Sequence, residues 1–165
     1  MNSAIPIEKL LRDADAVGVR LEIIDGLPVW EASPVYFHQA EIDRVRSSIK
    51  PLEVSYCEHV TNVYFRFKDG SLKRPDIALL PRKPLESEMD SALETVPEAV
   101  IEIISEGYED KDLRLAPGFY LTQGVKDVLI FDPRAKLIWH QRADGVRRFN
   151  SPQAFKLECG CECVV

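Results

Sequence analysis

The spacing of apolar and polar residues predicts a chain in which helices alternate with strands. Apolar positions recur at helical spacing up to about residue 16 and again over residues 35–49, and residues 110–123 form a third helical pattern. Strand-like segments, many of them bounded by Asp-Gly or Pro-containing turns, fill most of the remaining chain. These segments are residues 19–24, 27–30, 52–57, 62–67, 71–80, 96–105, 125–131, 137–141 and 146–149.

The order of these elements predicts a mixed sheet flanked by helices. The strand, helix and strand between residues 97 and 131 favour two parallel strands joined by a right-handed crossover. The earlier strands suit antiparallel pairing. We therefore expect an α/β fold of α+β-like character, with a helix and hairpin at the N-terminal end and another hairpin towards the C-terminus. A chain of 165 residues can bury one sizeable core, so we expect residues 1–165 to form a single domain.

Composition narrows the classes of function. The chain has 21 Lys and Arg against 27 Asp and Glu, a formal net charge of −6. This charge counts against a surface that binds nucleic acid everywhere, although a local basic groove is compatible with it. No run approaches the roughly 18 apolar residues of a membrane span. The N-terminus has no secretory pattern, so we expect a cytoplasmic location.

Two acids stand inside apolar, strand-like runs. Asp76 belongs to the run Lys-Arg-Pro-Asp-Ile-Ala-Leu-Leu, and Glu102 to the run Val-Ile-Glu-Ile-Ile-Ser. A carboxylate in such a run is unfavourable unless it is paired, hydrogen-bonded or bound to a cation. Neighbouring strands that carry one acid each could hold Mg²⁺ together with water and phosphate oxygens. The alternative is that both acids lie at strand edges and face solvent.

These two runs resemble the PD-(D/E)XK restriction-endonuclease-like superfamily. The chain is more closely similar to the Uma group, a set of bacterial proteins assigned as nucleases. Further segments match that group in order and together cover about residues 21–141. They are Leu-Glu-Ile-Ile-Asp-Gly from Leu21, Ser33-Pro34, His38-Gln39, Arg74-Pro75, Asp112, Tyr120, Gly124-Val125 and Ile-Phe-Asp-Pro from Ile130.

The resemblance implies an αβββαβ core whose acids bind Mg²⁺ or Mn²⁺ for phosphodiester hydrolysis, with nucleic acid, expected to be DNA, as the partner. Asp76 and Glu102 carry over as metal ligands. Glu22 and His38 carry over as residues near the same site, although a histidine on an apolar helix face is also typical of a hydrogen-bonded core residue. Relatives that cut two strands as dimers lead us to expect a homodimer.

The lysine that would activate water departs from the family pattern. The superfamily places it two residues after the second acid, where this chain has Ile104, and the Uma group places it four residues before the tyrosine, where this chain has Ala116. Lys111 is the nearest substitute, and Arg114 is a weaker one because arginine stays protonated. The alternative function is therefore a catalytically inactive binding or scaffold protein that retains the nuclease fold.

Basic residues flank Asp76. They could contact phosphates without reading sequence, but a solvated loop is the preferred interpretation for all of them. They are Lys73, Arg74, Arg82 and Lys83.

The remaining candidates are cysteines and histidines. Cys159, Cys161 and Cys163 alternate like residues on one face of a terminal strand, and Cys57 stands alone. Small residues on a buried face are the favoured interpretation, with a soft-metal site, a disulfide or a regulatory intermolecular bond as alternatives. His59 and His140 have no supporting pattern.

Overall fold

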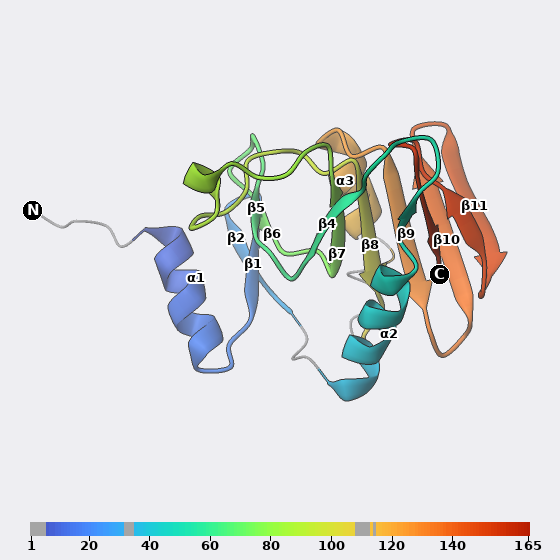
Figure 1. Cartoon of the computed structure of the whole chain (residues 1–165). Coiled ribbons are helices and arrows are strands. Elements are labelled where there is room, and N and C mark those ends of the chain that lie inside the picture. Colours follow the sequence, from blue (N-terminus) through green and yellow to red (C-terminus); the bar gives the residue numbers. More distant parts are fainter. Residues whose placement is uncertain (1–5, 32–34, 108–112, 114) are drawn as a thin grey trace, which may run out of the picture.

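A six-stranded mixed sheet forms the centre of the molecule. The computed structural model describes residues 6–31, 35–107, 113 and 115–165 (Figure 1). The strand order is β11-β10-β9-β8-β7-β4, with β8 and β9 parallel and every other pair antiparallel. The strands are β4 (Glu58–Thr61), β7 (Ile77–Leu80), β8 (Ala99–Ile103), β9 (Asp127–Asp132), β10 (Leu137–Arg142) and β11 (Gly145–Asn150).

Both faces of this sheet are covered. On one face, α2 (Tyr36–Ser47) packs with a three-stranded sheet of β12 (Ala154–Lys156), β13 (Cys161–Val164) and β3 (Lys50–Pro51). The other face is covered by α3 (Ala116–Thr122; Figure 1). This helix packs with aromatic side chains from residues 65–67. Strand β8 is buried along its whole length, as its nearly continuous apolar run predicted.

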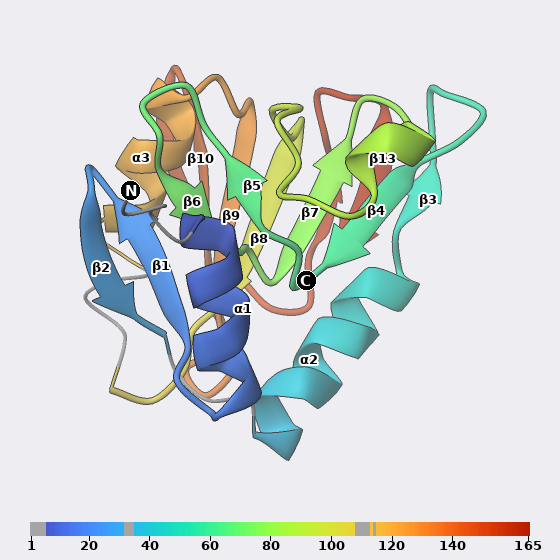
Figure 2. The ribbon, with the colours of Figure 1, turned by 90° about the vertical axis from the view of Figure 1, so that its left-hand side faces the viewer.

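A second antiparallel sheet lies beside the first. Its order is β2-β1-β6-β5, with β1 (Leu21–Ile24), β2 (Leu27–Trp30), β5 (Phe65–Arg66) and β6 (Leu72–Lys73). Helix α1 (Ile7–Ala16) contacts β1 (Figure 2), and a 3₁₀ turn (Glu86–Glu88) follows β7. The predicted N-terminal helix and hairpin are therefore confirmed.

The predicted third strand, residues 71–80, is wrong as a single element. Residues 74–76 interrupt it, so β6 joins the smaller sheet and β7 joins the larger one. Pro75 is the physical reason, because it has no N–H to donate to a sheet ladder. The predicted strand 52–57 is also wrong, because these described residues form the connection between β3 and β4. The predicted strand 62–67 shrinks to β5, and the short strands β3, β4 and β12 were not predicted.

The third helix, α3, lies within the range that its apolar pattern predicted. Helix α3 starts at Ala116 with Pro117 in its first turn, a position where proline suits a helix. The predicted start at residue 110 lies outside the described residues.

Among the described residues, no helix is long and apolar enough to cross a membrane.

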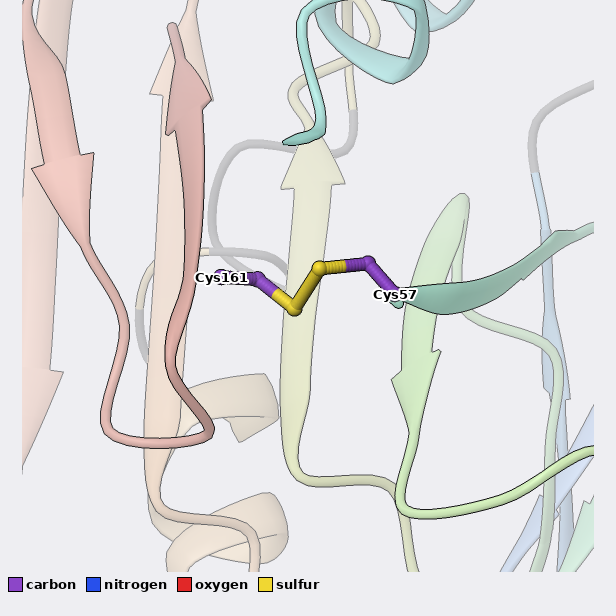
Figure 3. Close-up of a disulfide and its surroundings, with 2 residues drawn as sticks. All are labelled: Cys57 and Cys161. Carbon is purple, nitrogen blue, oxygen red and sulfur yellow. A yellow bond between two sulfur atoms is a disulfide. The ribbon is translucent and has the colours of Figure 1, made fainter. Parts of the chain in front are cut away.

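A disulfide joins Cys57 to Cys161 (Figure 3), with Cα atoms 6.2 Å apart. It ties the segment before β4 to β13. Cys161 and Cys163 are buried on β13, as predicted, and Cys159 is half-buried with a free thiol. The disulfide was the less favoured interpretation of this pattern, because Cys57 lies 104 residues away in sequence and only the fold brings it close.

Candidate functional site

Asp76 and Glu102 meet at one end of the sheet. Asp76 directly precedes β7, whose Ile77 pairs with Ile101 of β8. The Asp76 amide donates to Glu102 Oε2 (3.3 Å), and the Ile103 amide donates to Asp76 Oδ2 (2.8 Å). The antiparallel register of β7 and β8 therefore brings the two acids together, and neither is a solvent-facing edge residue.

His38 reaches the same place from the first turn of α2. Its Nε2 lies 2.9 Å from the Ile103 carbonyl oxygen and 3.3 Å from Asp76 Oδ2. A carbonyl oxygen only accepts hydrogen bonds, so Nε2 carries the proton in this arrangement. The side chains of His38 and Asp76 are each 14% exposed. His38 is thus both a hydrogen-bonded residue of the helix face and a neighbour of the acids.

Tyr120 lies on the face of the sheet opposite to α2 and holds Glu102 in place. Its hydroxyl, on α3, donates to Glu102 Oε1 at 2.7 Å. Complete burial, followed by the negative charges of Glu102 and Glu22, raises the pKa of Tyr120 well above its ordinary value. The phenol therefore stays protonated and acts as a permanent donor to this carboxylate.

A buried ion pair lies behind Tyr120. Lys73 Nζ is 2.9 Å from Glu22 Oε2, and both side chains are 1% exposed. The Arg74 amide donates to the other Glu22 oxygen (2.8 Å), and Lys73 Nζ lies 5.1 Å from the centroid of the Tyr120 ring. The pairing of β1 with β6, in which Ile23 faces Leu72, creates this contact.

The predicted solvated loop is therefore wrong for Lys73 and Arg74. Lys73 is inside the protein, and the Arg74 guanidinium forms ion pairs with Glu31 (3.0 Å) and Asp15 (3.3 Å). Arg82 and its neighbour Lys83 are exposed, as predicted. One feature of the sequence pointed to the buried Glu22–Lys73 pair. Glu22 is an acid in an alternating strand pattern, and an acid that such a strand buries needs a cation or a hydrogen-bond donor beside it.

The two positions where relatives carry the lysine hold apolar residues in this chain. Ile104 and Ala116 are both buried in the core cluster that contains Tyr120. Lys111 lies outside the described residues, so its role stays a prediction. Lys73, which the sequence placed only among possible phosphate contacts, instead lies inside the protein and contacts the ring that is hydrogen-bonded to Glu102.

The donor set suits a hard divalent cation. Two carboxylates and the Ile103 carbonyl lie within one hydrogen-bonded group, and oxygen ligands are what Mg²⁺ and Mn²⁺ prefer. Within the described part of the chain, no three His, Cys, Asp or Glu side chains are arranged to hold a metal. Asp76 and Glu102 are the two carboxylates at this end of the sheet that could hold such an ion.

The mixed sheet, with two acids at one end of neighbouring strands, defines a restriction-endonuclease-like protein. The sequence matches the model of the Uma2 family, described as "Putative restriction endonuclease", over residues 7–157, and the chain belongs to that family. Its fold is similar to the crystal structure of a protein from Anabaena variabilis ATCC 29413, titled "a putative nuclease belonging to DUF820". The TM-score is 0.63 at 19% identity, over 82% of this chain and 79% of the other. None of the curated proteins matches.

Proposed function

We propose that this protein is a metal-dependent endonuclease that hydrolyses phosphodiester bonds, with DNA as the expected substrate. The observation that carries this proposal is the direct bonding between the two acid-bearing segments, in which Asp76 N meets Glu102 Oε2 and Ile103 N meets Asp76 Oδ2. Membership of a restriction-endonuclease family supports it. The predicted homodimer and the predicted cytoplasmic location stay predictions.

Asp76 and Glu102 are the residues that would hold Mg²⁺ or Mn²⁺. Such an ion activates water and neutralises charge on a phosphate. Tyr120 holds one oxygen of Glu102, and the Ile103 amide holds one oxygen of Asp76, so each carboxylate is oriented before a ligand arrives. Orientation of ligands by a hydrogen-bonded outer shell is worth roughly 10- to 100-fold in metal affinity or activity.

His38 and the Glu22–Lys73 pair would act around these acids. His38 would hold the Ile103 carbonyl and Asp76 in position, since its Nε2 contacts both. Lys73 keeps a positive charge behind Tyr120, and Glu22 holds it in place. We propose Lys111 as the group near the attacking water, with Lys73 as the internal positive charge that supports the site.

One observation favours the alternative, a binding or scaffold protein that retains the fold. Ile104 and Ala116 fill both usual lysine positions with buried apolar side chains, and the described lysine beside the site is held by a carboxylate. A chain with these features could bind metal and nucleic acid without cleaving the polymer.

Cleavage of supercoiled plasmid in Mg²⁺ or Mn²⁺ tests the proposal. We expect Asp76→Asn and Glu102→Gln to lower the rate by at least about 100-fold, because each removes a ligand rather than a residue that only orients one. The charge-matched control is Asp144→Asn, since Asp144 lies on the β10–β11 turn with 65% of its side chain exposed. Cleavage that both site variants retain in full would refute the assignment of the acids. Calorimetric Mn²⁺ binding without cleavage would favour the scaffold function.

A further inference from the structure

A cavity of about 350 Å³ opens directly beside the candidate site. It lies between the start of α2, the residues that follow β8, and the β9–β10 turn. Its walls include Val35, Phe37, His38, Ile104, Ser105 and Arg134. Cavities of about 300–1,000 Å³ with apolar walls and a few polar groups are typical of small-ligand sites.

His38 lies between the cavity and the acids. The same imidazole that lines the cavity places Nε2 3.3 Å from Asp76 Oδ2, and the lining residue Ile104 comes two residues after Glu102. A group seated in this cavity would therefore be attached to, or adjacent to, whatever lies at the two acids. For a polynucleotide whose phosphate is at the acids, that group is a neighbouring nucleoside.

The walls suit a flat aromatic group next to a phosphate. Phe37 is 45% exposed, and the Arg134 guanidinium lies 6.0 Å from the centroid of its ring. Val35 and Ile104 add apolar surface, while Ser105 offers a hydroxyl that can bond a base edge. Bases stack on such aromatic rings whatever their sequence.

Arg134 is available to a phosphate. Its pair with Glu106 (3.0 Å) joins side chains that are 59% and 79% exposed, and exposed pairs of this kind are weak. A guanidinium binds phosphate oxygens through two parallel hydrogen bonds. An anionic backbone can thus exchange with Glu106 at the mouth of the cavity.

We propose that this cavity binds one unpaired nucleobase next to the phosphate at Asp76 and Glu102. A base within a stacked duplex cannot enter a side-chain cavity unless it leaves the stack. The substrate class is therefore single-stranded DNA, or duplex DNA with an unpaired or extruded nucleotide at the cleavage point. This inference rests on the proposed function, because it takes the phosphate to lie at the two acids.

Fluorescence anisotropy with Ca²⁺ as the hard cation tests base binding, because the two carboxylates would otherwise repel the phosphate, and a gel checks that the probe stays intact. The probe is a labelled single-stranded DNA of about 12 nucleotides, compared with its duplex and with versions that lack the base at one position after another. We expect tighter binding of the single strand than of the duplex. We also expect one position at which loss of the base weakens binding to the unaltered protein by about 10-fold.

Variants of Phe37 and Arg134 distinguish the contribution of base stacking to DNA binding from that of a phosphate contact. Phe37→Ala should bind the intact strand about 10-fold more weakly and lose the dependence on that one base, while Phe37→Trp should retain both. Arg134→Gln should weaken intact and base-free probes alike, because a phosphate contact is independent of the base. Tyr56→Ala, which removes another exposed aromatic ring, is the matched control and should change nothing. Circular dichroism checks that each variant is folded.

The results that would overturn the inference are distinct from those that would overturn the nuclease. A base scan without any sensitive position, equal binding of strand and duplex, no binding of either probe, or full affinity in Phe37→Ala would each exclude the base pocket, even if plasmid is cleaved. Base-dependent binding by a chain that cleaves nothing would support the pocket and favour the scaffold function.

Discussion

The two ends of the parallel pair β8 and β9 each hold an acid beside a histidine, but they differ in how the carboxylate is hydrogen-bonded. At the carboxyl end, Asp76 lies 3.3 Å from His38. At the amino end, Asp127 accepts hydrogen bonds from His140 (2.7 Å), Arg142 (2.6 Å) and the Glu158 amide (2.8 Å), and it is 0% exposed.

The two carboxylates differ in how many of their oxygens accept hydrogen bonds. Donors reach both oxygens of Asp127, so its burial is offset within the protein. The contacts to the Asp76 carboxylate within the described residues all involve Oδ2, and this end of the sheet opens into a cavity lined by His38. The first arrangement stabilises a fold, and the second suits a ligand.

The largest expected effect concerns the disulfide, which holds the segment that contains Glu158. We expect the double variant Cys57→Ala/Cys161→Ala to lower the free energy of unfolding by about 4 kcal/mol, since the closed loop is long. Urea titration measures the loss. Cys159→Ala, which removes a half-buried free thiol, is the control. A double variant as stable as the unaltered protein would show that the disulfide does not constrain this end.

Asp127→Asn should lower the free energy of unfolding by about 3 kcal/mol, because Arg142 and His140 lose the carboxylate that they share. Nuclease activity of the folded fraction should not change, since Asp127 lies at the far end of the strands from the candidate site. Urea unfolding and plasmid cleavage, each compared with Asp144→Asn, measure the two effects. Lost activity without lost stability would contradict a structural role for Asp127.

Mn²⁺ should stabilise the folded protein only by binding at the carboxyl end of β8 and β9. At a free concentration about 100 times its Kd, a ligand that binds only the folded state adds about 2.7 kcal/mol. Thermal unfolding should show this gain in the unaltered protein and in Asp127→Asn scanned at its own lower Tm, but not in Asp76→Asn. Equal stabilisation of Asp76→Asn would place the metal elsewhere.

The smallest effect is a change in acid sensitivity. Burial acts to raise the pKa of Asp127, but the hydrogen bonds from His140, Glu158 and Arg142 outweigh it and hold that pKa below the ordinary value of 3.8. A lowered folded-state pKa gives stability that is present above the unfolded pKa and is lost as pH falls through the folded one. Asp127→Asn should therefore show a shallower loss of stability on acidification below about pH 4 in urea titrations. An unchanged slope would contradict this.

Sequence reasoning identified the carboxyl-end acids but not the structural ones, for a physical reason. Asp76 and Glu102 each interrupt an apolar run, which is visible locally. Asp127 begins its strand, where an acid is ordinary, and its donors come from residues 140, 142 and 158. Lys73 and Arg82 likewise looked alike in sequence, and only the pairing of β6 with β1 buried one of them.

Local periodicity and short motifs were enough to predict the mixed sheet, the parallel β8–β9 pair, the meeting of the two acids and the family. The tertiary structure alone decided three things: the Glu22–Lys73 pair, the Cys57–Cys161 bond and the cavity between α2 and the β9–β10 turn. Each depends on segments distant in the chain meeting in one register, which no local pattern specifies. The acids of the carboxyl end are thus fixed by sequence, and their surroundings by the fold.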